Sequence, residues 1–233
     1  MKLSDVAMAY SVSPSHEGGE HSVLRGVDLD LRTGERLGIV GTNGAGKSTL
    51  LRVIAKIFSP ARGEVTWAPG VNVTLLSLGL GFREDLTGRE NAYLANMLQG
   101  YDRRTAKALL ADIRDFVELG DYFDEPVKTY SSGMRARLGF ATALMNNASV
   151  LLVDEVLGVG DAQFRHKAQQ ALLEKFAPDR GVVLVSHSPP MIKNLCNRAI
   201  WLDRGSVRVD GNPGQVLEAY EQGGRRDVSK SVS

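Results

Sequence analysis

The sequence predicts an α/β fold with a mainly parallel sheet, an N-terminal antiparallel β subdomain and an inserted helical subdomain. Three observations predict it. Residues 1–40 are rich in strand-like segments, apolar β-type runs alternate with helical patterns farther along, and a helical block at about residues 84–130 interrupts that alternation. We expect residues 1–222 to form this one domain, and residues 223–233 to be a disordered polar tail.

The composition is that of a folded domain without a marked charge. The chain has 233 residues, 43% of them apolar, and its 28 basic and 27 acidic side chains nearly cancel, which does not favour nucleic acid or an anionic membrane surface as a partner. No apolar run approaches the roughly 18–20 residues that span a bilayer. The N-terminus lacks the apolar core of a secretory signal. We therefore expect a cytoplasmic protein that acts at a membrane only through a partner.

A single cysteine, Cys196, excludes an internal disulfide and fits a reducing compartment. Because Ile192, Leu195 and Ala199 surround it in the sequence, we predict a small buried hydrophobe rather than a reactive thiol.

The strand-rich N-terminal region leads into a predicted turn at residues 32–35. A polar loop interrupts it at residues 13–20, and His16 and His21 lie in or beside this loop. Two loop histidines without further partners are typically solvated rather than metal-binding.

The stretch at residues 41–49 has the form of a phosphate-binding loop. It consists of Gly41, Thr42, Asn43, Gly44, Ala45, Gly46, Lys47, Ser48 and Thr49. Glycines let the backbone turn tightly so that successive N–H groups point at phosphate oxygens. Lys47 supplies a positive charge for the terminal phosphates, and Ser48 offers a hydroxyl to Mg²⁺. An apolar strand at residues 36–40 precedes the loop and a helical pattern follows it, which disfavours the alternative of a glycine-rich turn that binds nothing.

The middle of the chain changes from β-structure to helices. Residues 61–76 are predicted to be further β-structure, residues 77–82 are too glycine-rich for a regular element, and residues 87–120 are predicted to be helical. Thr87 and Glu90 have the spacing of a capping box at a helix start.

Two further apolar strands end in candidate site residues. Residues 150–153 precede Asp154 and Glu155, and residues 181–185 precede Ser186 and His187. Asp154 suits Mg²⁺, and Glu155 suits the polarisation of a water that attacks a γ-phosphate, with a solvated acidic turn as the alternative. His187 suits contact with the γ-phosphate, with a structural histidine as its alternative. Ligands bind where parallel strands end, so these residues and the phosphate loop should meet at one sheet edge.

The remaining segments complete the alternation. A helix follows Ser131, and another begins at Asp161. Residues 199–209 are predicted to form a hairpin, and residues 214–220 a short helix.

Small GTPases share the phosphate loop, but their Asn-Lys-x-Asp motif does not occur in this chain. With Ser131-Ser132-Gly133-Met134 ahead of the acidic strand, the sequence resembles the ATP-binding cassette (ABC) ATPases over about residues 3–220. The resemblance implies that residues 41–49 are the Walker A loop and that residues 150–155 are Walker B, with Glu155 as the catalytic glutamate. His187 would be the switch histidine, and Lys47 would be the third catalytic residue beside Glu155 and His187. The further nucleotide contacts that the resemblance implies are Tyr10, stacked on adenine, Ser131, Ser132 and Gly133 of the signature, and Asp161 of the D-loop.

Within this family the sequence is most similar to the ATPases that export O-antigen, capsule or teichoic acid. The matching segments are residues 78–82, 86–91, 126–134, 153–161 and 199–202. Two features depart from the general family. Ser77 stands where the family has a glutamine that reaches Mg²⁺, and the signature lacks the usual double glycine and glutamine. Some O-antigen ATPases carry a C-terminal carbohydrate-binding domain, which we do not expect here.

The resemblance also implies how the protein works. It predicts an ATPase that uses Mg²⁺ and forms a head-to-tail homodimer in which Lys47 of one copy and Ser131 of the other hold the same phosphate. Its partner would be an integral-membrane permease, present in two copies, that contacts the polysaccharide, and no nucleic acid would be bound. The location would be peripheral, on the cytoplasmic face of the cytoplasmic membrane. The alternatives are another ABC exporter or importer, or an ABC regulator that acts on nucleic acid or ribosomes.

Overall fold

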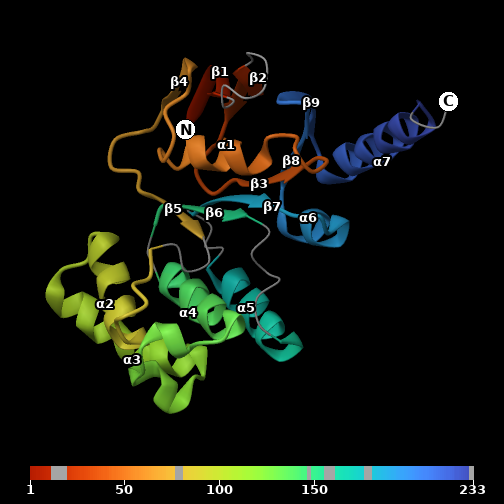
Figure 1. Ribbon diagram of the computed structural model, residues 1–233. Helices are drawn as coiled ribbons and strands as arrows, with labels where there is room; N and C mark the ends of the chain where they lie inside the picture. Colours follow the sequence, from red (N-terminus) through yellow and green to blue (C-terminus); the bar gives the residue numbers. More distant parts are fainter. Residues whose placement is uncertain (12–19, 77–80, 146–147, 155–160, 176–179, 231–233) are drawn as a thin grey trace. The chain divides into compact units, whose positions relative to one another are not determined.

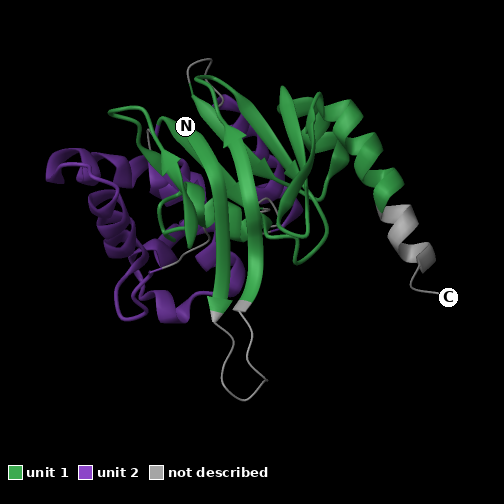
Figure 2. Cartoon of the chain, turned by 90° about the horizontal axis from the view of Figure 1, so that it is seen from above, with its two compact units in different colours: residues 1–73, 149–155, 178–233 green, residues 74–148, 156–177 purple. Residues whose placement is uncertain are grey.

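The structure, a computed structural model, describes residues 1–11, 20–76, 81–145, 148–154, 161–175 and 180–230. The chain forms two compact units (Figure 2). Unit 1 comprises Met1–Val73, Ser149–Glu155 and Pro178–Ser233, and unit 2 comprises Thr74–Ala148 and Val156–Ala177. The expected helical subdomain at about residues 84–130 falls inside unit 2, which also takes in the two helices that follow it.

An antiparallel sheet forms the N-terminal part of unit 1, as the sequence predicted. Its strands are β1 (Lys2–Ser11), β2 (Glu20–Asp30) and β4 (Arg62–Thr66), in the order β2-β1-β4. The register of β1 and β2 places Tyr10 opposite His21. Residues that face each other in this way share one face of the sheet, so both side chains belong to the same surface.

A second, mainly parallel sheet forms the centre of unit 1 (Figure 1). Neighbouring strands follow the order β6 (Val150–Asp154), β7 (Gly181–Val185), β3 (Arg36–Val40), β8 (Arg198–Asp203) and β9 (Ser206–Gly211). All these pairings are parallel except that of β8 with β9, which is the predicted hairpin. Strand β7 is buried throughout, as expected of a strand covered on both faces. Strand β5 (Val73–Leu76) carries the chain from unit 1 into unit 2.

Helices of unit 1 lie on both faces of this sheet. In Figure 1, α1 (Lys47–Ile54) lies above strands β3 and β7, and α6 (Pro189–Leu195) lies below them. Helix α6 approaches β3 closely at Gly38, where an added Cβ would stand 2.9 Å from Ile192 and 3.2 Å from the Cys196 sulfur. Cys196 is buried there, as the sequence predicted.

The C-terminal helix corrects one expectation. Helix α7 (Pro213–Lys230) continues well past residue 220, so residues 223–230 are helical rather than disordered, and residues 231–233 lie outside the described part. Packing against Trp201 accounts for the continuation of the helix as far as Gly223. The ring of Tyr220 meets the Trp201 ring at 5.9 Å in an edge-on arrangement. One turn later, a Cβ on Gly223 would stand 2.2 Å from that ring, so glycine lets the helix pass it.

Unit 2 is helical. It contains α2 (Gly88–Leu98), α3 (Arg103–Val117), α4 (Ser132–Leu144) and α5 (Ala162–Glu174), with 3₁₀ turns at Gly120–Asp124 and Val127–Thr129. The predicted capping box is present, because Thr87 accepts from the Glu90 N–H and Glu90 accepts from the Thr87 N–H. Buried side chains of α2, α3 and α4 pack into one core. Within the described ranges, no helix combines the length and apolarity needed to cross a bilayer.

Candidate nucleotide-binding site

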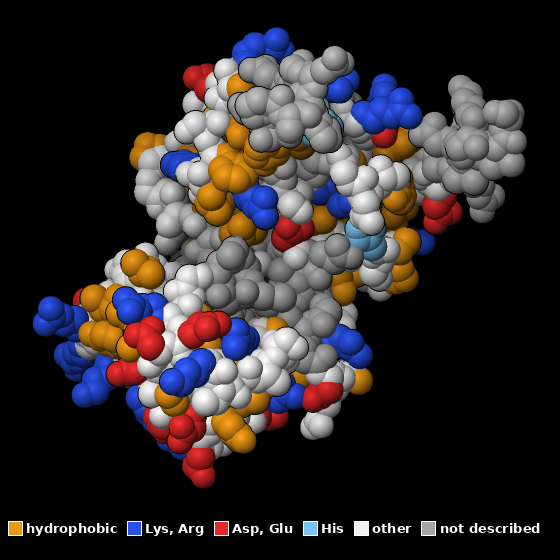
Figure 3. All heavy atoms as spheres, viewed as in Figure 1, with side chains coloured by type: hydrophobic (Ala, Val, Ile, Leu, Met, Phe, Trp, Pro, Cys, Tyr) orange, Lys and Arg blue, Asp and Glu red, His pale blue; other side chains and the backbone are white. Residues whose placement is uncertain are grey.

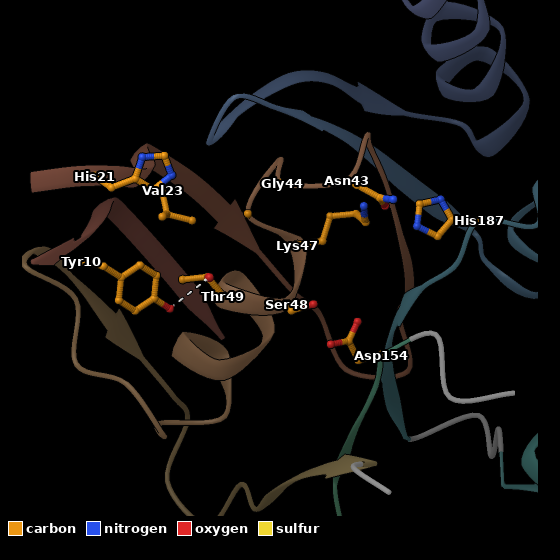
Figure 4. A pocket seen from close by; sticks show the side chains of 11 residues that line it. Tyr10, His21, Val23, Asn43, Gly44, Lys47, Ser48, Thr49, Asp154 and His187 are labelled. Atoms are coloured by element: carbon orange, nitrogen blue, oxygen red, sulfur yellow. Dashed lines mark hydrogen bonds between the residues drawn. The ribbon is translucent and has the colours of Figure 1, made fainter. Parts of the chain in front are cut away.

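A pocket of about 350 Å³ lies in unit 1 where β3, β6 and β7 end. Figure 4 shows side chains from the phosphate loop, from both sheets and from the segment after β7 around it. The residues that line it are Tyr10, His21, Val23, Asn43, Gly44, Gly46, Lys47, Ser48, Thr49, Asp154 and His187. The sequence predicted all of these except His21 and Val23, and it predicted that three separated segments would meet at this edge.

Three glycines shape the phosphate loop for different reasons. Gly44 has φ +79° with open space around it, so the left-handed backbone alone requires glycine there. Gly46, with φ +101°, also lies against the Val23 carbonyl, which a Cβ would approach to 2.9 Å. Gly41 lies against β8, where a Cβ would stand 2.2 Å from the Leu202 carbonyl oxygen. The loop thus packs directly on two strands, β2 and β8.

Helix α1 begins at Lys47, with Gly46 as its N-cap residue. The first N–H groups of a helix have no acceptor one turn earlier in that helix. The N–H groups of Lys47, Ser48 and Thr49 belong to this first turn, and all three residues line the pocket. The partial positive charge of a helix N-terminus therefore faces the pocket and favours an anion there.

The Lys47 side chain spans the loop. Its ammonium group donates to the carbonyl oxygens of Gly41 at 2.7 Å and Thr42 at 2.8 Å. The residue is only 8% exposed, although it carries a charge. Burial of a charged side chain is costly unless it is hydrogen-bonded, so these two carbonyl bonds hold the cation beside the loop N–H groups.

Two residues that line the pocket supply oxygen atoms of the kind that Mg²⁺ binds. Figure 4 shows the Ser48 hydroxyl and the Asp154 carboxylate directed into the same space. Asp154 is the last residue of β6 and is half-buried. A hydroxyl beside a carboxylate is a donor set that Mg²⁺ accepts when it also keeps waters and phosphate oxygens. The residues present therefore fit this ion.

His187 lies at the far end of the pocket from Tyr10, on the same side of Lys47 as Asn43 (Figure 4). It stands just beyond the end of β7. As the sequence predicted, His187 follows an apolar strand and lies at the same sheet edge as the phosphate loop.

The opposite end of the pocket has an aromatic wall. The hydroxyls of Tyr10 and Thr49 are hydrogen-bonded at 3.2 Å, and the Tyr10 ring meets the Phe58 ring edge-on at 6.2 Å. His21 and Val23 of β2 adjoin Tyr10. His21 is exposed, as expected, but it belongs to strand β2 rather than to the loop. Its place in the pocket depends on the register that pairs it with Tyr10, so the strand alternation of His21 and Val23 does not predict it.

The Asp203–Ser206 turn between β8 and β9 is hydrogen-bonded to the phosphate loop. The Gly205 N–H donates to the Ala45 carbonyl at 3.1 Å, and its carbonyl accepts from the Arg25 N–H at 2.8 Å. Arg204 and Gly205 both have positive φ, 47° and 81°, and a Cβ on Gly205 would stand 2.3 Å from the Val23 carbonyl oxygen. The turn therefore ties strand β2 to the phosphate loop.

Several predicted residues stand outside this pocket. Gly41, Thr42 and Ala45 belong to the loop but do not line the pocket. Glu155 and Ser77 lie outside the described residues. Ser131, Ser132, Gly133 and Asp161 belong to unit 2.

In unit 2, two of the predicted residues cap helices. Ser131 caps α4 by accepting from the Met134 N–H at 3.2 Å. Asp161 caps α5 by accepting from the Phe164 N–H at 2.9 Å, and it pairs with Arg137 of α4. The bond from Phe164 and the positive charge of Arg137 lower the pKa of Asp161, so this carboxylate stays charged at neutral pH.

Comparison with known proteins identifies relatives. Residues 24–158 match the family described as ABC transporter. The teichoic acids export ATP-binding protein TagH of Shouchella clausii is 38% identical over 200 residues, which cover 85% of this chain and 54% of that protein. The O-antigen export system ATP-binding protein RfbB of Klebsiella pneumoniae is 36% identical over 206 residues, covering 88% and 83% of the two chains. The chain thus spans about half the length of the first relative.

Solved structures give the same fold. An ATP-binding cassette in a dimeric post-hydrolysis state bound to ADP and Pi superposes with a TM-score of 0.76 at 22% identity, covering 91% of this chain and 98% of that one. With the family match, the relatives and the phosphate-loop pocket in agreement, the resemblance predicted from the motifs is confirmed: the chain belongs to the ABC transporter family.

Proposed function

We propose that this chain binds MgATP in the unit 1 pocket and hydrolyses it to drive export of a lipid-linked surface polysaccharide. One observation carries the proposal. Lys47, Ser48, Asp154 and His187 come from three segments of the chain and line one pocket at the ends of parallel strands. A loop cation, a hydroxyl–carboxylate pair and an imidazole are the groups that phosphoryl transfer from a nucleoside triphosphate uses.

Each residue then has a stated task. The loop N–H groups and the Lys47 ammonium hold the β- and γ-phosphates, while Tyr10 offers its ring to adenine. Ser48 and Asp154 hold Mg²⁺, which supplies charge neutralisation on the phosphates when bound. Glu155 follows Asp154 in the sequence and orients the attacking water, and His187 contacts the γ-phosphate.

A second copy of the chain completes this site in the proposal. Ser131, Ser132 and Gly133 stand at the N-terminus of α4, where first-turn N–H groups and the Ser131 hydroxyl suit a γ-phosphate. Asp161 begins α5 in the same unit. ATP would bind the closed pair more tightly than the open pair, and this difference shifts the equilibrium towards closure. Hydrolysis then lets the copies separate.

The cargo and the membrane partner follow from the relatives. Both of those described above are export ATP-binding proteins, one for teichoic acids and one for O-antigen. We therefore propose that two copies of the chain work with two copies of an integral-membrane permease, peripherally on the cytoplasmic face of the membrane. Acidic and basic side chains are interspersed on the face drawn in Figure 3, which supports a protein partner over nucleic acid.

The glutamate tests the ATPase mechanism. We expect Glu155→Gln to bind ATP normally. Its hydrolysis rate should fall by about a hundredfold or more, since general-base catalysis contributes about 10²–10⁴-fold. With ATP and Mg²⁺ the variant should form a stable dimer in light scattering. The control is Glu174→Gln, an exposed residue at the end of α5. Wild-type turnover by Glu155→Gln would refute the mechanism.

Gene deletion tests the cargo. We expect a strain without this gene to lose its surface polysaccharide while lipid-linked polymer accumulates inside the cell. Normal surface polysaccharide would exclude this cargo. A defect in the uptake of a nutrient, or in translation, would point instead to another ABC transporter or to an ABC regulator.

A further inference from the structure

In unit 2, the segment before α2 runs alongside the segment before α4. We call residues 84–89 and 124–130 together the clasp. Backbone hydrogen bonds join its two sides, and Thr87 and Pro126 form an isolated antiparallel bridge. The bonds are Val127 N–H to Leu86 O at 2.9 Å, Lys128 N–H to Glu84 O at 3.0 Å, and Gly88 N–H to Glu125 O at 3.2 Å. The two helix starts are therefore held together by main-chain contacts.

Ion pairs reinforce the clasp at both ends. The Arg89 guanidinium donates twice to Asp124, at 2.5 and 3.1 Å, and these bonds lower the pKa of Asp124. Arg135 of α4 donates to Glu84 at 3.0 Å. Bidentate guanidinium–carboxylate pairs fix orientation as well as distance, so this pair ties the first turn of α2 to Asp124.

Tyr130 is the buried centre of the clasp. It is 5% exposed, and its hydroxyl donates to the Tyr122 carbonyl oxygen at 2.5 Å. Burial raises the pKa of Tyr130 to about 12. The hydroxyl therefore keeps its proton at neutral pH and remains a donor.

The Tyr130 hydroxyl also lies against Gly88. A Cβ added to Gly88 would stand 2.1 Å from the hydroxyl oxygen and 3.1 Å from the ring carbon that carries it. Because Gly88 has no positive φ to require glycine, it is crowding that excludes a side chain at the start of α2, first by the tyrosine hydroxyl and then by the Phe123 carbonyl oxygen at 3.0 Å. Glycine and tyrosine thus fit each other as a pair.

Ser131 follows Tyr130 directly and is the N-cap of α4. We propose that Tyr130 is a positioning residue, whose hydroxyl, seated between Gly88 and the Tyr122 carbonyl, fixes Ser131 and the first turn of α4 for contact with the nucleotide of a second copy. This inference rests on the proposed function. The signature would then be held by the start of α2, so that a displacement of α2 displaces Ser131 too.

A suppressor experiment tests the pair. Gly88→Ala should lower kcat by about tenfold or more with KM for ATP within about twofold, since a displacement near 1 Å can cost about a hundredfold in rate. Tyr130→Phe removes the nearest atom that the new methyl group meets, the hydroxyl oxygen at 2.1 Å, while the Phe123 carbonyl oxygen at 3.0 Å and the ring carbon at 3.1 Å remain. The double variant should therefore recover only to the kcat of Tyr130→Phe, because it also lacks the positioning hydroxyl. The matched control is Gly214→Ala at the start of α7, where the nearest neighbour is a side-chain oxygen at 3.3 Å.

Outcomes separate this inference from the proposed function. If the wild type lacks ATPase activity, the proposed function fails. If the wild type is active but Gly88→Ala matches it, or the double variant recovers the wild-type kcat without the hydroxyl, the positioning role is refuted. Should Gly88→Ala not fold, Tyr130→Phe alone decides: a lower kcat with unchanged KM and unchanged binding of a fluorescent ATP analogue supports the role, and wild-type kcat overturns it.

Discussion

The N–H group of Gly205 donates a hydrogen bond to the carbonyl oxygen of Ala45 at 3.1 Å. This bond joins the turn after β8 to the phosphate loop, although the two residues are far apart in the sequence. The same glycine accepts from Arg25 of β2. The turn therefore sets how far the loop stands from the strand that carries His21 and Val23.

Gly205→Ala should weaken ATP binding by about tenfold, measured by titration with a fluorescent analogue. Alanine at positive φ costs about 1–2 kcal/mol, and its Cβ would also stand 2.3 Å from the Val23 carbonyl oxygen. The control is Gly70→Ala, because Gly70 has φ +77° in unit 1 and open space around it. Both variants should lose stability, but only Gly205→Ala should lose affinity. Equal ATP affinities would contradict the support role.

Tyr10 should act through its ring. Tyr10→Ala should raise KM for ATP by about tenfold, because stacking of a base on an aromatic ring is worth about 1–3 kcal/mol. Tyr10→Phe keeps the ring and loses only the 3.2 Å hydrogen bond to Thr49, so its KM should stay within about threefold of wild type. Steady-state kinetics checks both. A larger effect of Tyr10→Phe than of Tyr10→Ala would exclude stacking.

Gly223→Ala should destabilise unit 1 by about 1–3 kcal/mol, the usual cost of overpacking. Its methyl group would stand 2.2 Å from the Trp201 ring, so α7 or the ring must move. Thermal unfolding and the environment of Trp201, read from its fluorescence, measure the effect. Trp201→Phe in the same chain makes room and should recover part of the loss. If Gly223→Ala unfolds at the wild-type temperature, α7 does not pack as described.

The Cys196 thiol should be inert in the folded protein. Burial raises the pKa of this thiol to about 12, so at pH 8 almost none of it is thiolate. From the size of that pKa shift, we expect a thiol reagent to react with the folded protein at least about a hundredfold more slowly than with the protein in denaturant. In denaturant the one cysteine should react fully. Because the folded-state pKa is raised, the contribution of this thiol to the stability of the folded protein is complete below pH 9 and is lost as the pH rises towards 12. Rapid reaction at pH 8 would contradict burial.

The sequence predicted the parts of the site that are local. The phosphate loop, Asp154 and His187 each follow an apolar strand, and that pattern is enough to bring them to one edge. His21 was not predicted, because its place depends on the register of β2 against β1, which no short pattern encodes. The length of α7 was missed for a similar reason. Gly223 resembles a helix end in sequence, and only the Trp201 ring explains why the helix needs it.

Strand β3 lies between β7 and β8, so residues 36–40 are paired with residues 181–185 and 198–203. The ribosome adds about 5–20 residues per second. The segment with Lys47 therefore emerges long before residues 181–185 and 198–203 have been made. We therefore expect a nascent chain to bind nucleotide only after residues 181–185 and 198–203 have been made. Retention on immobilised ATP would accordingly report translation through β8, and prematurely terminated products would pass through such a column.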